Sequence, residues 1–255
     1  MKTKFISTSD PEYGKKLAKI ILDGGIVGAI WGHHLYILAC NGLDINAVTK
    51  LNKLKERSSN QVCAIAGAIE EIEEFVDLKE TKGLMSTAKK VKVAPLEYIE
   101  LLFRKFPLLI EFAHNERAPK SAVAINERGN SVWIGGHLGD KFYTNLITEA
   151  RNLRSEGEPI VIVGSSLNLH GDSTLTVRDL EKTIKDFGNK IDALAVHHRA
   201  DQLKRLSFSL SSSVISFLTV TPTLLRIGST RFDTLRKYIP DLKLAENVVR
   251  IKRTV

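Results

Sequence analysis

The residue pair most suited to chemistry is Lys55 and Arg57, which flank one residue at the end of a predicted helix and just before a strand. Two cations spaced in this way can both be directed at a phosphate or carboxylate in a cleft above the sheet edge. Cations at a helix C-terminus also stabilise the helix dipole without binding any ligand. The pair alone therefore leaves an anion site and a solvated helix end as alternatives.

A second candidate is the stretch GSSLNLHGD at residues 164–172, which follows the most clearly predicted strand of the chain. Ligands of open α/β sheets bind beyond the carboxyl ends of the strands. Ser165, Ser166 and Asn168 supply short polar side chains at such a position, and Gly164 and Gly171 permit close approach of the backbone. An ordinary Ser/Asn turn would have the same composition.

A third candidate combines hydroxyls at the start of one predicted strand with an arginine near the end of the next. Ser212 and Ser213 begin the segment SSVISFL, and Arg226 precedes Gly228 at the end of TLLRIG. An arginine at a strand end before a glycine can hold a phosphate through two parallel hydrogen bonds. The alternative is a surface arginine beside a turn.

Two adjacent histidines, His33 and His34, lie in the segment WGHHLYIL together with Tyr36. In an extended chain, neighbouring side chains point to opposite sides, so the two imidazoles cannot chelate one ion together. No acidic or cysteine side chain accompanies them in that segment, which argues against a metal site. We expect the histidines to line a pocket or a turn, and we predict no metal ligands in the chain.

The elements that must position these residues alternate between helices and strands. Apolar residues at helical spacing predict helices over residues 10–23, 44–57, 69–80, 96–106, 141–154 and 176–187. Short apolar runs predict strands over residues 26–30, 62–68, 107–113, 131–136, 159–166, 191–198, 212–218 and 223–228. Asp10 and Asp44 are expected to begin the first two helices, and Ser173 or Thr174 to begin the last. This order predicts an α/β protein with a twisted, partly parallel sheet.

Length and charge narrow the class of protein further. The 255 residues are 43% hydrophobic and 26% charged, which excludes a disordered or fibrous chain. Lys and Arg outnumber Asp and Glu by 37 to 29, so the formal net charge of +8 favours an anionic partner such as a nucleotide or nucleic acid. We expect one domain over residues 1–240, followed by a basic C-terminal tail over residues 241–255.

Compartment and membrane association follow from a few residues. Cys40 and Cys63 are too few for a disulfide framework or a thiolate metal site, which predicts a cytoplasmic location. The uncharged stretch Gly24–Leu43 has about the length of a membrane span. It contains two histidines, an asparagine and five glycines, which are costly in lipid. We interpret it as a buried strand, a glycine-containing loop and a second buried segment, and we expect no membrane anchor or signal peptide.

Taken together and in order, these segments resemble the YrdC-like family of threonylcarbamoyl-AMP synthases. The resemblance extends from about Lys15 to about Arg236. The matching motifs are a lysine–x–arginine pair at Lys55 and Arg57, a serine- and asparagine-containing loop at residues 166–171, a serine–threonine–valine–valine strand at residues 212–215 and an arginine–x–glycine pair at Arg226 and Gly228. An ordered match of this kind is more specific than any single motif.

The resemblance implies a twisted open mixed sheet with flanking helices and a basic concave cleft. Family members condense L-threonine, bicarbonate and ATP to threonylcarbamoyl-AMP and pyrophosphate for tRNA modification, with Mg²⁺ carried by the substrate phosphates. The catalytic residues that the resemblance implies are Lys55, Arg57, Ser166 and Asn168. The nucleotide-binding residues that it implies are these four together with Ser212, Ser213 and Arg226.

The chain departs from the family on the substrate side. The family's proline–threonine–x–threonine–x–tyrosine–glycine signature lies where this chain has residues 31–37, and only Tyr36 is retained. The arginine of the family's valine–x–valine–arginine segment is replaced by Gly135. Loss of hydrogen-bonding groups for a small polar substrate weakens discrimination for that substrate. We therefore expect an altered acceptor pocket formed by His33, His34 and Tyr36.

The leading interpretation is a nucleotidyltransferase that forms a carbamoyl-adenylate from ATP, bicarbonate and an amino acid, with threonine as the default amine. The alternative is a catalytically degenerate relative that binds RNA or nucleotide through the basic cleft. The net charge, the run Lys89–Lys92 and the basic tail motivate this alternative. The binder would show RNA affinity that falls steeply with salt.

Overall fold

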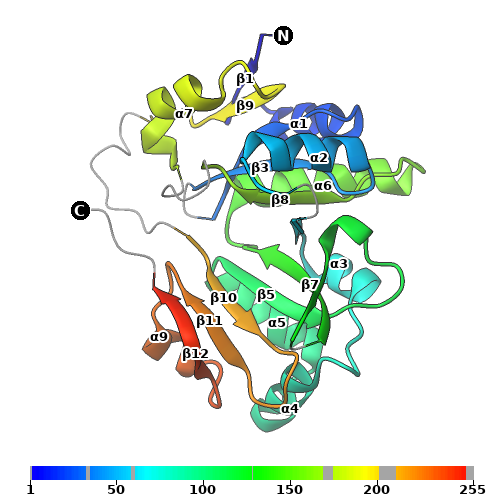
Figure 1. Cartoon of the computed structure of the whole chain (residues 1–255), viewed down its shortest axis with the longest axis vertical. Coiled ribbons are helices and arrows are strands. Elements are labelled where there is room, and N and C mark those ends of the chain that lie inside the picture. The colour runs from blue at the N-terminus through cyan, green and yellow to red at the C-terminus, as the bar shows by residue number, and fades with distance from the viewer. Residues whose placement is uncertain are drawn as a thin grey trace. The chain divides into compact units, whose positions relative to one another are not determined.

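A computed structural model describes residues 2–32, 35–58, 61–127, 129–168, 175–200 and 211–250, which form an α/β structure (Figure 1). The chain divides into two compact units. Unit 1 comprises Met1–Cys63 and Asp140–Leu210, and unit 2 comprises Ala64–Gly139 and Ser211–Thr254. Each unit contains its own strands and helices, as follows. The prediction of a domain that ends at residue 240 remains a prediction.

The strands of unit 1 form a mixed sheet whose first part is parallel. Their order is β1 (Lys4–Ser7), β9 (Ala193–Val196), β2 (Val27–Trp31), β3 (Leu35–Asn41) and β8 (Ile162–Ser166). Strand β9 runs parallel to both β1 and β2, whereas β3 is antiparallel to β2 and β8. The helices of unit 1 are α1 (Tyr13–Leu22), α2 (Ile45–Leu54), α6 (Lys141–Ser155) and α7 (Leu180–Phe187). Helix α7 follows a 3₁₀ turn, η2 (Val177–Asp179).

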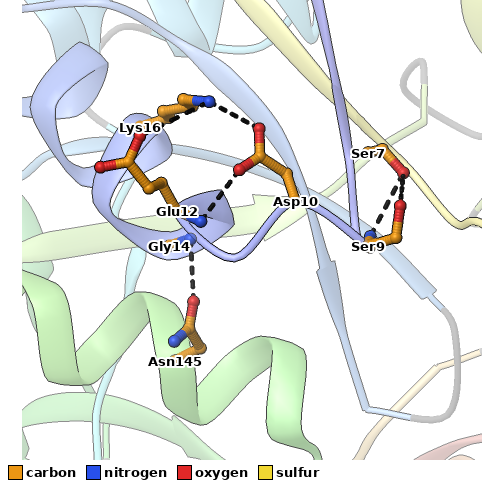
Figure 2. Close-up of polar contacts among 7 residues, drawn as sticks. All are labelled: Ser7, Ser9, Asp10, Glu12, Gly14, Lys16 and Asn145. Carbon is orange, nitrogen blue, oxygen red and sulfur yellow. Dashed lines mark hydrogen bonds and ion pairs between the residues drawn. The ribbon is translucent and has the colours of Figure 1, made fainter.

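Helices α1 and α6 pack closely because α1 presents a glycine where the two helices meet (Figure 2). The amide of Gly14 donates to Oδ1 of Asn145 over 2.8 Å, and a Cβ on Gly14 would lie 2.3 Å from that oxygen. The start predicted at Asp10 was wrong, because α1 begins at Tyr13 after Glu12. Asp10 lies in the turn before the helix, where its Oδ1 accepts the amide of Glu12 (2.9 Å) and its Oδ2 contacts Nζ of Lys16 (2.6 Å). A glycine at this contact lets the two backbones approach.

The predicted helix starts were partly correct. Asp44 begins α2, since its Oδ1 accepts the amides of Asn46 (2.9 Å) and Ala47 (3.3 Å). The start predicted at Ser173 or Thr174 was wrong. The helical segment there begins with η2, and Thr176 exchanges hydrogen bonds with Asp179 in a capping box. Residues 173 and 174 themselves lie outside the described residues.

Unit 2 also contains a mixed sheet (Figure 1). Its strands lie in the order β4 (Ala64–Ala66), β7 (Gly129–Gly136), β5 (Leu108–Ala113), β10 (Ser213–Ser216), β11 (Thr223–Ile227) and β12 (Lys243–Arg250), and β6 (Val123–Asn126) pairs with β7. Strand β5 is parallel to β10 and antiparallel to β7. The helices are α3 (Ile69–Phe75), α4 (Lys82–Val91), α5 (Pro95–Lys105) and α9 (Phe232–Arg236), with a 3₁₀ turn η1 (Lys120–Ala122).

One face of the unit 2 sheet packs against α5. A Cβ on Gly136 of β7 would lie 2.5 Å from the ring of Phe103, so this face of β7 and the α5 ring are in direct contact. Side chains of β5 that share this face, Leu108, Ile110 and Phe112, are completely buried. The apolar core of unit 2 therefore lies between the sheet and its helices.

Segments near the end of the chain differ from the sequence-based expectation. Residues 243–250, which fell within the predicted basic tail, form β12 and pair with β11 in parallel. The pattern did not suggest a strand because Lys243 and Glu246 are exposed on an edge strand.

Some elements elsewhere in the chain were also not predicted. These are α4, β1, β6 and α9, and β3 was predicted only as a buried segment. No helix within the described ranges is both long and apolar enough to cross a membrane.

Candidate anion-binding site

Lys55 is the central residue of a polar cluster in unit 1. It follows the last residue of α2 and is only 5% exposed. Its ammonium donates to the backbone oxygen of Ser166, to the backbone oxygen of Asn168 (2.9 Å) and to Oδ1 of Asn168 (2.9 Å). An ammonium has three protons. Lys55 therefore uses its three donors on the turn that follows β8.

The environment of Lys55 disfavours its charged form. Burial, followed by the neighbouring cation of Arg57, lowers the pKa of Lys55 to about 8. The three acceptors around the ammonium are neutral oxygens. A negatively charged ligand near this ammonium would reverse the shift, because an opposite charge favours protonation.

Arg57, which follows Glu56 in the sequence, contacts the end of β8. Glu56 is exposed and has a φ of 54°, a left-handed conformation that ends α2 and separates the two cations. The guanidinium of Arg57 donates from Nε to Oδ1 of Asn52 (2.7 Å), and from its two terminal nitrogens to Oγ of Ser165 (3.1 Å) and Sγ of Cys63 (3.3 Å). A guanidinium has five N–H donors. Two donors are thus left for a ligand.

Neither cation has an acidic partner in the part of the chain that the structure describes. The partners given above are carbonyl, amide, hydroxyl and thiol groups. Burial raises the pKa of the Cys63 thiol, so it accepts from Arg57 as a neutral group. Burial also lowers the pKa of Arg57. A buried and a partly buried cation side by side, without a carboxylate partner, form a site that favours an anion.

The turn after β8 is held by its own hydrogen bonds as well. Oγ of Ser166 donates to Oδ1 of Asn168 over 2.7 Å, so this amide oxygen accepts from both Ser166 and Lys55. The shared oxygen fixes which end of the Asn168 amide faces Lys55. The structure therefore brings together the four residues predicted as catalytic, Lys55, Arg57, Ser166 and Asn168, although their catalytic roles remain predictions.

The other predicted nucleotide-binding residues lie together in unit 2. Nε of Arg226 donates to the backbone oxygen of Ser212 (3.1 Å), and burial lowers the pKa of Arg226. Ser213 is completely buried, and its hydroxyl donates to the backbone oxygen of Thr230 (2.8 Å) and accepts the amide of Gly228 (3.1 Å). These contacts join the start of β10 to the end of β11. Their role toward a nucleotide remains a prediction.

The predicted acceptor pocket is only partly described. His33 and His34 lie outside the described residues. Tyr36 is completely buried in β3, and its hydroxyl donates to the backbone oxygen of Ala195 over 2.9 Å. Its described contact is therefore with β9 of its own unit. Among the residues that the structure describes, no group of three or more His, Cys, Asp or Glu side chains could hold a metal ion.

Sequence reasoning missed the supporting partners of Arg57. Asn52 is completely buried on the apolar face of α2, beside Val48 and Leu51. An amide at an apolar helix position was the signal that could have identified it, because a buried polar group needs a partner. Cys63 was assigned only to the core, and Ser165 was named as a polar side chain of the loop but not as a catalytic or nucleotide-binding residue.

Comparison with known proteins gives the family of the chain. The Sua5/YciO/YrdC family, described as telomere recombination, matches residues 19–228. No curated protein sequence gives a significant match.

Two structures of Sua5 from P. abyssi are similar to this chain, with TM-scores of 0.70 and 20% identity over 95% and 96% of its length. One of them contains L-threonine. This chain spans only 65% and 63% of those two chains.

Two further relatives share the fold. E. coli YciO aligns with a TM-score of 0.61 and 16% identity, over 90% of this chain and 96% of its own. HypF in a phosphate- and nucleotide-bound form aligns with a TM-score of 0.57 and 20% identity, over 85% of this chain and 29% of its own. At these identities the structural likeness concerns the fold. The family match over residues 19–228, together with this shared fold, shows that the chain belongs to the Sua5/YciO/YrdC family.

Proposed function

We propose that the chain is a nucleotidyltransferase that uses ATP to activate a carbamate, in the manner of threonylcarbamoyl-AMP synthases. The observation that carries this proposal is the pair of neighbouring cations, the buried Lys55 and the partly buried Arg57, which face neutral acceptors where a ligand anion would complete the charge balance. Family membership supports it. The P. abyssi Sua5 structure with L-threonine and the nucleotide-bound HypF structure make an amino acid and a nucleotide reasonable ligands.

The chemistry assigns distinct tasks to the two cations. An amino acid and bicarbonate give a carbamate and water. A carbamate oxygen then attacks the α-phosphorus of ATP while the bond to pyrophosphate breaks. Negative charge develops on the phosphate oxygens, which cations and Mg²⁺ bound to the phosphates would stabilise. Arg57 would contact the phosphates with its two remaining donors. Lys55 would contribute charge and hold the turn of Ser166 and Asn168 in place.

Threonine is the default amine, and an altered acceptor pocket around His33, His34 and Tyr36 is part of the proposal. The contacts predicted for Ser212, Ser213 and Arg226 with the nucleotide are also retained. A cytoplasmic location agrees with two free cysteines, Cys40 and Cys63.

The decisive measurement is pyrophosphate release from ATP by the full chain with Mg²⁺, bicarbonate and each amino acid in turn. We expect release that depends on bicarbonate and on one amino acid, and that is lost in Arg57→Ala. A matched control is Lys53→Ala, which removes an exposed cation from the same helix. Absence of release with every amino acid would contradict the proposal.

A second candidate is a non-enzymatic binder of RNA. The net charge of +8 favours it, because two or three cations at a phosphate site do not account for that excess. It predicts RNA affinity whose logarithm falls linearly with the logarithm of salt concentration, and only a modest loss in Arg57→Ala. Pyrophosphate release separates the two functions.

A further inference from the structure

Strands β5 and β7 place a tryptophan and a glutamate side by side on one face of the unit 2 sheet. Glu111 lies opposite Trp133 in the antiparallel register, and Leu109 lies opposite Gly135. Side chains at opposed positions share a face, and those of successive residues alternate. Gly136, three residues along β7 from Trp133, faces α5. Because side chains alternate along a strand, Trp133 lies on the face of the sheet away from that helix.

The indole of Trp133 is anchored by a buried carboxylate. Oε1 of Glu111 accepts from Nε1 of Trp133 over 3.1 Å and from Oγ of Ser131 over 3.0 Å. Glu111 and Ser131 are completely buried, whereas Trp133 is partly exposed. The two buried groups therefore fix the orientation of an indole whose ring remains accessible.

A hydrogen-bonding partner holds an indole differently from an apolar neighbour. The hydrogen bond from Nε1 of Trp133 to Glu111 restricts the ring to one orientation, which burial of apolar surface alone does not do. A fixed and partly exposed aromatic ring is what stacking on a flat ligand requires.

Two positions adjoin the indole on this face of the sheet. Gly135, two residues along β7, has no side chain but is buried, and its partner Leu109 is partly exposed. The indole of Trp133 and the aliphatic side chain of Leu109 together are suited to contact a planar ring, and stacking accepts any ring with a π face.

We propose that Trp133 is a stacking platform for a planar aromatic ring of a ligand, and that Glu111 is the positioning residue for this platform. The ring has two sources, a nucleobase or the aromatic side chain of an amine substrate. The inference goes beyond the adenylate chemistry, which requires phosphate contacts but no tryptophan.

Tryptophan fluorescence of the full chain tests the proposal with three probes: adenosine, L-phenylalanine and tripolyphosphate. The signal of Trp133 is the difference between the wild type and Trp133→Phe. The other tryptophan, Trp31, is 9% exposed, packs edge-to-face with Tyr143, and is the internal reference. We expect either adenosine or L-phenylalanine to quench Trp133, and tripolyphosphate to leave it unchanged. Quenching by adenosine identifies a nucleobase, and quenching by L-phenylalanine identifies a side chain.

Variants separate stacking from a structural role. Because the Trp133 variants lack the fluorophore, affinity for the quenching probe is measured by calorimetry. Trp133→Leu should weaken binding about tenfold, whereas Trp133→Phe should retain most of the affinity. Glu111→Gln keeps an acceptor for the indole and should retain the affinity, and Glu111→Leu should lower it several-fold. In a Trp133→Phe background the Glu111→Leu change should have no further effect on affinity, because phenylalanine has no N–H to accept.

Failure of this inference is distinguishable from failure of the proposed function. If neither adenosine nor L-phenylalanine quenches Trp133, or if Trp133→Leu and Trp133→Phe both bind the probes as the wild type does, the stacking platform is disproved. The proposed function would not be contradicted by that result, because it is tested separately by pyrophosphate release. Conversely, quenching by adenosine without pyrophosphate release would contradict the enzyme and retain the platform.

Discussion

The ammonium nitrogen of Lys55 lies 2.9 Å from both the backbone oxygen and the side-chain amide oxygen of Asn168. This contact joins the end of α2 to the turn after β8, two segments that are 113 residues apart in the chain. The buried charge thus fixes the geometry of the turn. At the same time it carries a desolvation cost that a bound anion would relieve.

The first prediction concerns the pH dependence of stability. The pKa of Lys55 is about 8 in the folded protein, against an ordinary value of 10.5. Between these values the unfolded chain holds a proton that the folded chain does not, so the contribution of Lys55 to the free energy of unfolding rises with pH. The full rise is about 3 kcal/mol, at 1.36 kcal/mol for each pKa unit. Urea denaturation from pH 7.5 to 9.5 covers the first part of this rise, about 2 kcal/mol at the same slope.

The control for this prediction is Lys55→Met. Other lysines and tyrosines also titrate at high pH, so the difference between the wild type and the variant isolates Lys55. That difference should become more favourable to the wild type as the pH rises. A difference that is constant between pH 7.5 and 9.5 would show that the ammonium is not desolvated.

The second prediction concerns Arg57 as the direct contact to phosphate. Arg57→Ala should weaken binding of tripolyphosphate by about 2 kcal/mol, or roughly thirtyfold, since it removes charged hydrogen-bond donors from a partly buried site. Isothermal titration calorimetry gives the affinity. Lys53→Ala, which removes an exposed cation of α2, should change it less than twofold. Equal losses in both variants would mean that only the overall charge attracts the ligand.

The sequence predicted most elements around this site because their signals are local. Asp44 begins α2 through two backbone amides, and the apolar run before Gly164 forms β8, as expected. Strand β12 gave no such signal, because an edge strand with Val249 exposed does not need an alternating apolar pattern. Local patterns are informative where a segment buries one face and fail where it does not.

The candidate site was predicted in its residue types and not in its contacts. Lys55, Arg57, Ser166 and Asn168 could be grouped by their resemblance to a family. That Lys55 would donate to oxygens of Ser166 and Asn168, and that Arg57 would donate to Ser165, depends on packing between the end of α2 and the end of β8. Such long-range contacts are set by the tertiary fold, which no local spacing in the sequence encodes.

The third prediction concerns Gly228, the glycine that follows Arg226 and Ile227. A Cβ at this position would lie 2.3 Å from the backbone oxygen of Ser211 and 2.4 Å from the backbone carbon of Ser212. Backbone atoms cannot rotate away as a side chain can, so Gly228→Ala must displace β10 from β11. We expect a loss of about 3 kcal/mol in the free energy of unfolding.

Gly129→Ala is the matched control for Gly228→Ala. Gly129 has a φ of 121°, but a Cβ there would meet nothing within 4 Å. Its substitution should cost only about 1 kcal/mol, from backbone strain alone. The urea midpoints of the two variants compare the cost of steric crowding at Gly228 with the cost of backbone strain at Gly129. A Gly228→Ala protein as stable as Gly129→Ala would indicate that β10 and β11 separate easily.

The fourth prediction contrasts two adjacent serines at the start of β10. Ser212 is 2% exposed, and its hydroxyl has no hydrogen-bond partner among the described residues. The hydroxyl of Ser213 has three, since it contacts the backbone oxygen and amide of Thr230 (2.8 and 3.3 Å) and the amide of Gly228 (3.1 Å). Ser213→Ala should therefore lower the free energy of unfolding by about 2 kcal/mol, whereas Ser212→Ala should raise it by about 1 kcal/mol.

Ser212→Ala should affect ligand affinity in the opposite direction from its effect on stability. A buried hydroxyl without a partner is a cost that a bound nucleotide can remove. Ser212→Ala should thus be a more stable protein that binds ATP several-fold more weakly, as measured by calorimetry alongside urea denaturation. If Ser212→Ala gains stability and keeps its affinity for ATP, the hydroxyl does not meet the nucleotide, and the assignment of Ser212 to nucleotide binding is wrong. A residue that costs stability and adds affinity belongs to a binding site rather than to the core.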